Sequence, residues 1–196
     1  MTDEVRSYLK PAAFSQPALS RPIGLVGFMG AGKTTVGQAL AARLQQEFID
    51  LDEVIQAHAR RTIAEIFEQG GEGAFRRLER QLLEEVLSSR PSGGWVLSLG
   101  GGAFIDNMNR ELLRVKQVET VFLDAPAEEL FRRCAQPGSV RPLLADRGRF
   151  NLLLDERRPA YLKAALSVQT AGKEVASIVD EIIARLSPDG ASGAAW

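Results

Sequence analysis

A glycine-rich loop near the start of the chain has the residues and the spacing of a phosphate-binding site. Gly27–Thr35 reads Gly-Phe-Met-Gly-Ala-Gly-Lys-Thr-Thr, which fits the pattern G-x-x-x-x-G-K-[ST]. Glycines allow backbone N–H groups to turn toward an anion, and a helix that begins after the loop adds its positive end. Lys33 can reach the β- and γ-phosphates of a nucleotide, and the Thr34 hydroxyl can bind Mg²⁺. A glycine-rich turn with an incidental lysine is the alternative, and the strand and helix patterns on either side favour the phosphate site.

Two carboxylates follow the next predicted strand. Asp50 and Asp52 are separated by one residue, so both side chains point to one side if the chain is still extended there. One acid could then act near a metal ion, while the other accepts a proton from an attacking hydroxyl. Asp52 also precedes a helical pattern that begins at Glu53, so it could cap that helix, and the cap does not exclude the other role.

Three glycines, Gly100–Gly102, end the third predicted strand, where many P-loop enzymes carry an acidic residue. They form either a flexible turn or a place where another molecule approaches the backbone, and we favour the second interpretation. Two pairs of adjacent arginines could bind further anions. Adjacent residues on a helix point about 100° apart, so only one of each pair can face a given pocket, and spacing does not show which one. The open choices are Arg76 or Arg77, and Arg157 or Arg158.

An alternation of strands and helices must position these residues. Apolar runs predict five strands, at 22–27, 47–51, 95–99, 119–123 and 166–170. Helical patterns cover 33–46, 53–60, 62–71, 72–90, 106–115, 126–135, 149–164 and 174–187. Thr62 and Glu65 form a capping box, Asp106 is a predicted N-cap, and Pro159 predicts a kink or break. The pattern predicts an α/β fold in which a doubly wound, three-layer parallel sheet binds ligands at the strands' carboxyl ends.

The segment 136–148 interrupts this alternation with two prolines, two glycines and two arginines. Such a composition predicts a mobile lid, and Arg141 within it could act on phosphates during transfer. Residues 1–20 and 188–196 are predicted to be tails. The expected organisation is therefore a single domain at 21–187.

Composition excludes several other classes of protein. The chain has 196 residues, of which 45% are hydrophobic, and this suits one globular domain. The net charge of −1 gives no reason to expect nucleic acid or an anionic membrane as a partner. The single cysteine, Cys134, rules out an intrachain disulfide, and no Cys/His cluster resembles a zinc site. His58 lies in a polar run and is expected to be a solvated surface residue.

Targeting signals are also missing from the sequence. No stretch reaches the roughly 20 apolar residues of a membrane span, and the N-terminus has no apolar core of a signal peptide. Asp3 and Glu4 argue against an acid-poor organelle transit peptide. The sequence predicts a cytoplasmic monomer.

Taken together, these stretches resemble shikimate kinase. The resemblance spans about residues 22–187 in order, and the pieces that carry it are Gly27–Thr35, Phe48–Asp52, Ile63–Phe67, Gly71–Glu79, Leu97–Gly102, Val140–Leu144 and Arg157–Tyr161. The P-loop alone would not identify the family. Asp-x-Asp, Phe-Arg-Arg, Gly-Gly-Gly and Arg-x-Pro-x-Tyr in this sequence order are specific to it.

The resemblance implies a P-loop kinase, similar to nucleoside monophosphate kinases in fold, that transfers the γ-phosphate of ATP to the 3-hydroxyl of shikimate. It implies that Arg76 and Arg157, and not their neighbours, bind the carboxylate of shikimate. Asp52 would bind the substrate hydroxyls and assist deprotonation. The backbone of Gly100, Gly101 and Gly102 would contact shikimate.

The same resemblance assigns residues to ATP and Mg²⁺. The phosphates would be bound by Gly30, Ala31, Gly32, Lys33, Thr34 and Thr35. Thr34 would be the direct protein ligand of Mg²⁺, and Asp50 would help place the ion through water. Arg141 would be the lid arginine and Arg133 would flank the adenine, although the loop after the last strand, Thr170–Glu174, lacks the proline usual in the family.

Two rival functions remain open at this point. One is a related kinase of another carboxylated polyol such as gluconate, which the Asp-x-Asp motif and the paired arginines count against. The other is a catalytically silent relative that binds nucleotide. Such a relative should have lost a site residue, and none is missing from the sequence.

Overall fold

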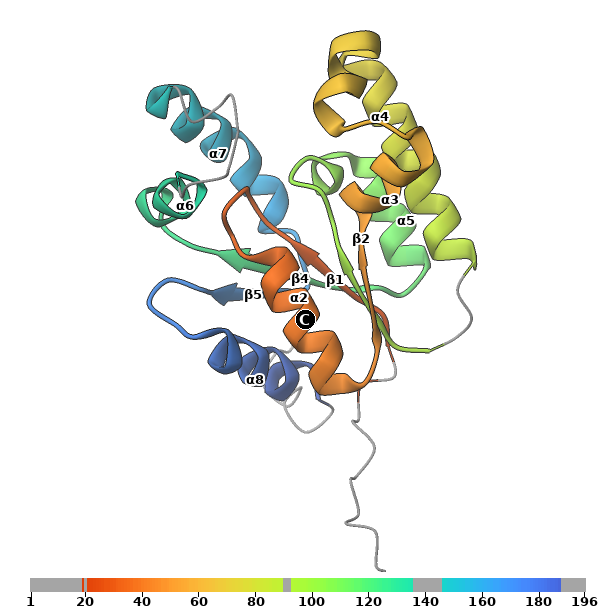
Figure 1. Cartoon of the computed structure of the whole chain (residues 1–196). Coiled ribbons are helices and arrows are strands. Elements are labelled where there is room, and N and C mark those ends of the chain that lie inside the picture. Colours follow the sequence, from red (N-terminus) through yellow and green to blue (C-terminus); the bar gives the residue numbers. More distant parts are fainter. Residues whose placement is uncertain (1–18, 20, 90–92, 136–145, 188–196) are drawn as a thin grey trace, which may run out of the picture.

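Five parallel strands form one sheet in the computed structural model, which describes residue 19 and residues 21–89, 93–135 and 146–187. The strands are β1 (Ile23–Val26), β2 (Glu47–Asp50), β3 (Trp95–Ser98), β4 (Glu119–Asp124) and β5 (Leu166–Gln169). Their order in the sheet is β2-β3-β1-β4-β5 (Figure 1). Arg141, most of the predicted lid and nearly all of both predicted tails lie outside the described residues.

Burial along the strands follows their place in the sheet. Every residue of the central strands β1 and β3 is buried, which explains why they read as continuous apolar runs. The edge strand β5 alternates between buried and exposed residues. The register pairs Asp50 of β2 and Leu25 of β1 with Ser98 of β3. The loops that follow these three strands therefore leave from the same edge of the sheet.

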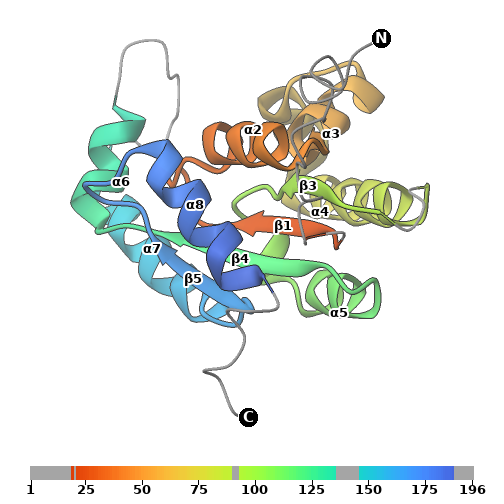
Figure 2. The same ribbon diagram turned by 90° about the horizontal axis from the view of Figure 1, so that it is seen from below.

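Helices cover both faces of the sheet, as the alternating pattern predicted. The helices α2 (Lys33–Leu44) and α8 (Val175–Leu186) pack against each other on one face. The helices α5 (Asn107–Val115) and α7 (Arg147–Tyr161) lie on the other face (Figure 2). The three-layer, doubly wound arrangement is confirmed. Such a sheet binds ligands at the carboxyl ends of its strands.

Local signals set the remaining helix boundaries. Glu65 accepts a hydrogen bond from the Thr62 N–H at 2.7 Å, and Thr62 Oγ1 accepts one from the Glu65 N–H at 3.3 Å. This capping box begins α4 (Ile63–Ser89), which is divided at Gly71 because φ 69° and ψ 178° leave the helical region there. The Asp106 carboxylate accepts from the Met108 N–H at 2.7 Å and caps α5 as predicted.

The helix predicted over 149–164 is present as α7, and the break that Pro159 could have caused is absent. The helix continues through Pro159 to Tyr161. Only two helical residues follow the proline, so the lost hydrogen bond lies in the last turn, where it costs least. The other helical elements are α3 (Leu51–Ala59), α6 (Ala127–Cys134) and the short 3₁₀ helix η1 (Ala103–Ile105).

Candidate active site

The glycine-rich loop connects β1 to α2 at the carboxyl edge of the sheet. Gly27, Gly30 and Gly32 have φ values of 149°, 80° and 91°, which L side chains rarely adopt. At Gly30 a Cβ atom would also lie 2.6 Å from the Leu130 carbonyl oxygen. Gly32 is the N-cap of α2 and provides no capping side chain, so the first N–H groups of this helix are not capped from Gly32. The loop and the helix end together suit an anion.

Lys33 extends back over this loop. Its Nζ donates to the carbonyl oxygens of Gly27 at 2.9 Å and Phe28 at 3.2 Å. Thr34, the next residue, donates from Oγ1 to Asp50 Oδ2 at 2.9 Å. The structure thus brings the predicted phosphate ligand Lys33 and both predicted magnesium residues, Thr34 and Asp50, to one corner of the sheet.

The two aspartates after β2 differ in their local structure from the prediction. The helix cap is Asp50 and not Asp52, because Asp50 Oδ1 accepts a hydrogen bond from the Asp52 N–H at 3.0 Å. The helix α3 already begins at Leu51, so the chain is not extended between the two acids and the argument from alternating side chains does not apply. Asp50 still has extended backbone angles, and its short carboxylate reaches the N–H groups of the helix that follows.

Asp52 lies against the three glycines that follow β3. A Cβ atom on Gly100 would stand 2.6 Å from Asp52 Oδ1 and 3.3 Å from Glu79 Oε1. A Cβ atom on Gly102 would stand 2.3 Å from both terminal nitrogens of Arg76. Near Gly101 the closest side-chain atom would be Arg157 Nη1, at 3.8 Å. Side chains in this loop would therefore displace the groups predicted to bind the second substrate, and glycine leaves the backbone accessible to them.

Arg76 is held by two glutamates on its own helix. It donates from Nη1 to Glu79 Oε2 at 2.8 Å and contacts the exposed Glu72 at 3.3 Å. Glu79 is 1% exposed, and Glu79 Oε1 has no hydrogen-bond partner within the described part of the chain. Burial raises the pKa of Glu79, and the Arg76 guanidinium offsets part of this shift. The neighbouring Arg77 is exposed, so the two arginines differ in burial, a difference that their spacing in the sequence does not show.

Arg157 and Arg158 face different surroundings on α7. Arg157 Nη1 donates to the Gly101 carbonyl oxygen at 3.4 Å. Arg158 Nη2 lies 2.5 Å from Oδ2 of Asp124, a carboxylate that is 3% exposed at the end of β4. Tyr161 Oη also donates to the Gly101 carbonyl, and burial raises the pKa of Tyr161 to about 12. The hydroxyl of Tyr161 therefore remains protonated at neutral pH and keeps this donor role.

Arg133, predicted beside the adenine, lies where α6 meets the loop after β5. Its Nη1 and Nη2 donate to Oγ1 and the carbonyl oxygen of Thr170 at 3.1 Å and 3.0 Å. Its Nε donates to Glu129 at 2.8 Å. Thr170 is buried and begins the loop that lacks a proline, so Arg133 connects α6 to this loop.

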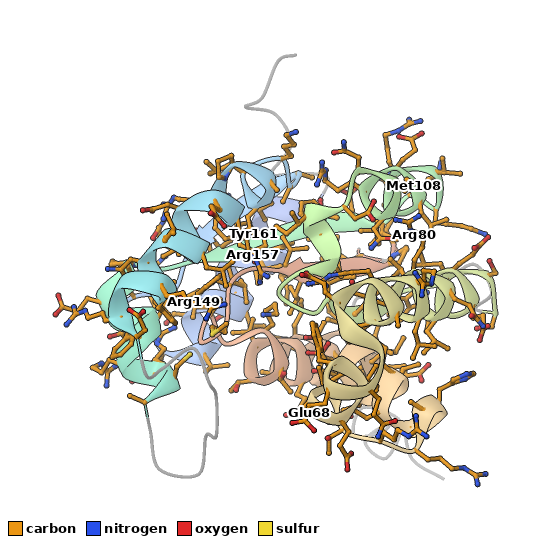
Figure 3. The ribbon with its side chains drawn as sticks, turned by 90° about the horizontal axis from the view of Figure 1, so that it is seen from above. Glu68, Arg80, Met108, Arg149, Arg157 and Tyr161 are labelled. Atoms are coloured by element: carbon orange, nitrogen blue, oxygen red, sulfur yellow. The ribbon has the colours of Figure 1, made fainter. Side chains whose placement is uncertain are left out.

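A cleft of about 460 Å³ lies between the first half of α4 and one face of α7. Figure 3 looks onto the carboxyl edge of the sheet and shows Arg149, Arg157 and Tyr161 in order along α7. The residues that line the cleft are Phe67, Glu72, Arg76, Arg149, Leu152, Leu153, Glu156 and Arg157. A larger cavity of about 680 Å³ lies at the opposite edge, near the beginnings of β4 and β5. The P-loop, the Asp50–Asp52 turn and the three glycines lie at the carboxyl edge of the sheet, on the same side as the smaller cleft, but they are not among its lining residues.

Sequence reasoning did not single out Glu79 and Tyr161, which the structure places against Arg76 and Gly101 in the candidate site. Glu79 looked like a surface partner for Arg76, three residues away, and nothing in the spacing showed that it is buried. Tyr161 belongs to the Arg-x-Pro-x-Tyr stretch, which was a usable signal, but its contact with Gly101 joins residues 60 apart in sequence. Such a contact depends on the packing of α7 against the loop after β3.

Metal ligands and membrane spans were searched in the described residues. They contain no cluster of three or more His, Cys, Asp or Glu side chains able to hold a metal ion. Thr34 and Asp50 offer one hydroxyl and one carboxylate, a pair that suits an ion which takes its other ligands from phosphates and water. Among the described helices, none combines the length and the apolar character needed to cross a membrane.

Comparisons with known proteins agree on one family. The family model described as shikimate kinase matches residues 29–187. A shikimate kinase from Salinibacter ruber is 41% identical over 170 residues, covering 81% of each chain. One from Persephonella marina is 39% identical and covers 85% of this chain and 99% of its own.

Solved structures lead to the same family. A shikimate kinase from Acinetobacter baumannii in complex with shikimate superposes with a TM-score of 0.77 at 36% identity, covering 85% of this chain and 93% of that one. Members of this family are kinases that use ATP as co-substrate. With the family model covering most of its length and relatives about 40% identical, this chain belongs to the shikimate kinase family.

Proposed function

We propose that this protein transfers the γ-phosphate of ATP to the 3-hydroxyl of shikimate, giving 3-phosphoshikimate and ADP. One observation carries the proposal. Asp52, Arg76 and Arg157 come from three separate segments and meet around Gly100–Gly102. This loop lies beside the P-loop, because both leave the same edge of the sheet. The arrangement offers two guanidinium groups for a carboxylate and one carboxylate for a hydroxyl.

Binding of shikimate would follow from charge and shape. Arg76 and Arg157 would form charge-assisted hydrogen bonds with the substrate carboxylate, and their planar groups match its two oxygens. The buried Glu79 fixes the direction of Arg76. The backbone of the three glycines would contact the ring and its hydroxyls. Phe67 provides an apolar wall of the cleft.

ATP would bind with its phosphates in the P-loop, at residues 30–35, and its adenine beside Arg133. Lys33 would exchange its contacts with loop carbonyls for the β- and γ-phosphates. Thr34 and Asp50 would hold Mg²⁺, Asp50 through water, and the ion would neutralise phosphate charge. Arg141 would act from the lid.

The transfer itself needs little beyond positioning and one proton acceptor. The oxygen of the 3-hydroxyl forms a bond to the γ-phosphorus, while the bond from this phosphorus to the bridging oxygen breaks. The electron pair of the broken bond stays on ADP, and the hydroxyl proton passes to the Asp52 carboxylate. Lys33 stabilises the negative charge that spreads over the phosphoryl oxygens.

A coupled assay of ADP release tests this proposal. Purified protein should release ADP on addition of shikimate and not with gluconate, and Lys33→Ala should abolish release in a folded protein. Asp52→Asn keeps the shape of the side chain and should lower kcat by about 10²-fold or more, the scale of losing a general base. Equal rates with gluconate, or no ADP release by the wild type, would refute the assignment.

Asp50→Asn separates the two aspartates. Asparagine is as good an N-cap as aspartate, so the helix α3 should remain stable. Because the proposed role of Asp50 is near the metal, the variant should need a higher Mg²⁺ concentration for half-maximal rate. A monomer acting in the cytoplasm is also part of the proposal, and gel filtration and cell fractionation would test it.

A further inference from the structure

Arg149 is a cation in the cleft that the proposed mechanism does not use. It is the third residue of α7, and it shares a cleft-lining face of that helix with Leu152, Leu153, Glu156 and Arg157. Arg157 is eight positions after Arg149 on the helix, a distance of about 12 Å along the axis. The cleft therefore has an arginine at each end of its α7 wall (Figure 3).

The charge of Arg149 is not neutralised within the described part of the chain, where no hydrogen bond or ion pair of its guanidinium is found. Its neighbours three and four positions later are Leu152 and Leu153. The acid three positions earlier is Asp146, whose carboxylate accepts a hydrogen bond from the Arg149 backbone N–H at 3.0 Å as the helix cap. A positive side chain in the first turn of a helix is also unfavourable, because the helix dipole is positive there. Stability of α7 therefore gives no reason for an arginine at this position.

The arginine two positions earlier is different. Arg147 pairs with Glu128 at 3.4 Å, and its guanidinium lies 5.5 Å from the centre of the Phe131 ring. Both contacts are on α6, away from the cleft. Arg147 and Arg149 thus share a helix turn and a charge, and only Arg149 lines the cleft.

The packing of Phe150 shows which end of the cleft Arg149 occupies. Phe150 is fully buried, and its ring meets the P-loop residue Phe28 edge to face, with centroids 5.0 Å apart. The carbonyl oxygen of Phe28 accepts a hydrogen bond from Lys33 Nζ. Arg149 is adjacent to Phe150 and so lies at the P-loop end of the cleft, while Arg157 lies at the end near Gly101.

We infer that Arg149 binds the phosphoryl group while it is transferred and after it has been attached to shikimate. The inference rests on the proposed function, in which Arg76 and Arg157 bind the carboxylate at the other end of the cleft. A guanidinium forks onto two phosphate oxygens with good geometry. Arg149 would therefore favour the transition state and the product over the free alcohol.

Three variants test this role: Arg149→Ala, Arg149→Lys and the matched control Arg147→Ala. For Arg149→Ala we expect kcat to fall roughly ten- to 100-fold, the effect of losing one hydrogen bond to a charged group. The KM for shikimate should change by less than about twofold, because the contact is made only after the phosphoryl group arrives. Arg149→Lys should recover part of the rate, and Arg147→Ala should stay within about twofold of wild type.

Calorimetric titration without ATP gives a second reading. Arg149→Ala should bind 3-phosphoshikimate at least about tenfold more weakly and shikimate with nearly unchanged affinity. Its melting temperature should equal or exceed that of wild type, since an unfavourable charge is removed from the helix end. A merely structural residue would instead lower the melting temperature and weaken both ligands together.

Two results would overturn the inference. One is a kcat for Arg149→Ala within twofold of the Arg147→Ala value, and the other is unchanged binding of 3-phosphoshikimate. A wild type that releases no ADP with shikimate would instead refute the proposed function. Wild-type activity combined with a fully active Arg149→Ala would refute the role of Arg149 alone.

Discussion

Two neighbouring arginines of α7 should respond in opposite ways to replacement by alanine. Arg157 donates to the Gly101 carbonyl at 3.4 Å beside the Tyr161 hydroxyl, and it lines the cleft. Arg158 pairs with the buried carboxylate of Asp124. We therefore expect Arg157→Ala to lose affinity for shikimate and keep its stability. Arg158→Ala should lose stability and keep its affinity for shikimate.

The size of each effect follows from the contacts. Removing one partner of a fully buried ion pair costs about 3–5 kcal/mol. Arg158 is 39% exposed, and Gln169 still donates to Asp124 at 2.9 Å, so we expect about 2 kcal/mol and a melting temperature lower by about 4–8 °C. For Arg157→Ala, the loss of a charged hydrogen bond should raise the KM for shikimate roughly ten- to 150-fold.

Thermal unfolding followed by circular dichroism and steady-state kinetics on both variants would measure these effects. The wild type and the two single variants should be compared in the same buffer, since exposed charges respond to salt. If Arg158→Ala bound shikimate poorly at an unchanged melting temperature, the two roles would be exchanged. The assignment of the carboxylate-binding arginine would then be wrong by one residue.

Two further predictions concern a glycine and a titratable group. Gly102→Ala would bring a Cβ atom 2.3 Å from the Arg76 guanidinium, a flexible group, so the KM for shikimate should rise while the melting temperature holds. Gly73→Ala on α4 has room and is the control, and equal KM values would refute the reasoning. Hydrogen bonds from Arg132 and Arg133 lower the pKa of Glu129 from 4.5 to about 2. Stability from Glu129 is therefore present above pH 4.5 and lost as the pH falls toward 2. Urea midpoints of wild type and Glu129→Gln should converge over that range, and parallel curves would contradict this.

Signals that act over a few residues could be read directly from the sequence. The P-loop, the capping box at Thr62 and Glu65, and the Asp106 cap all depend on neighbours within about four positions. The division of α4 at Gly71 and the order of strands and helices were predicted for the same reason. These signals identified the fold class and the phosphate-binding half of the candidate site.

The tertiary structure decided which side chains meet. The sequence allowed Asp52 to be the N-cap of the next helix, but in the structure the N-cap is Asp50, because α3 begins at Leu51, directly after β2. Spacing could not separate Arg157 from Arg158, and the packing of α7 placed one at Gly101 and the other at Asp124. The burial of Glu79 was equally hidden. These outcomes depend on parallel strands whose loops meet at one edge of the sheet although they are far apart in sequence, as for Gly101 and Arg157, which are 56 residues apart. Patterns that act over a few residues contain no information on such contacts.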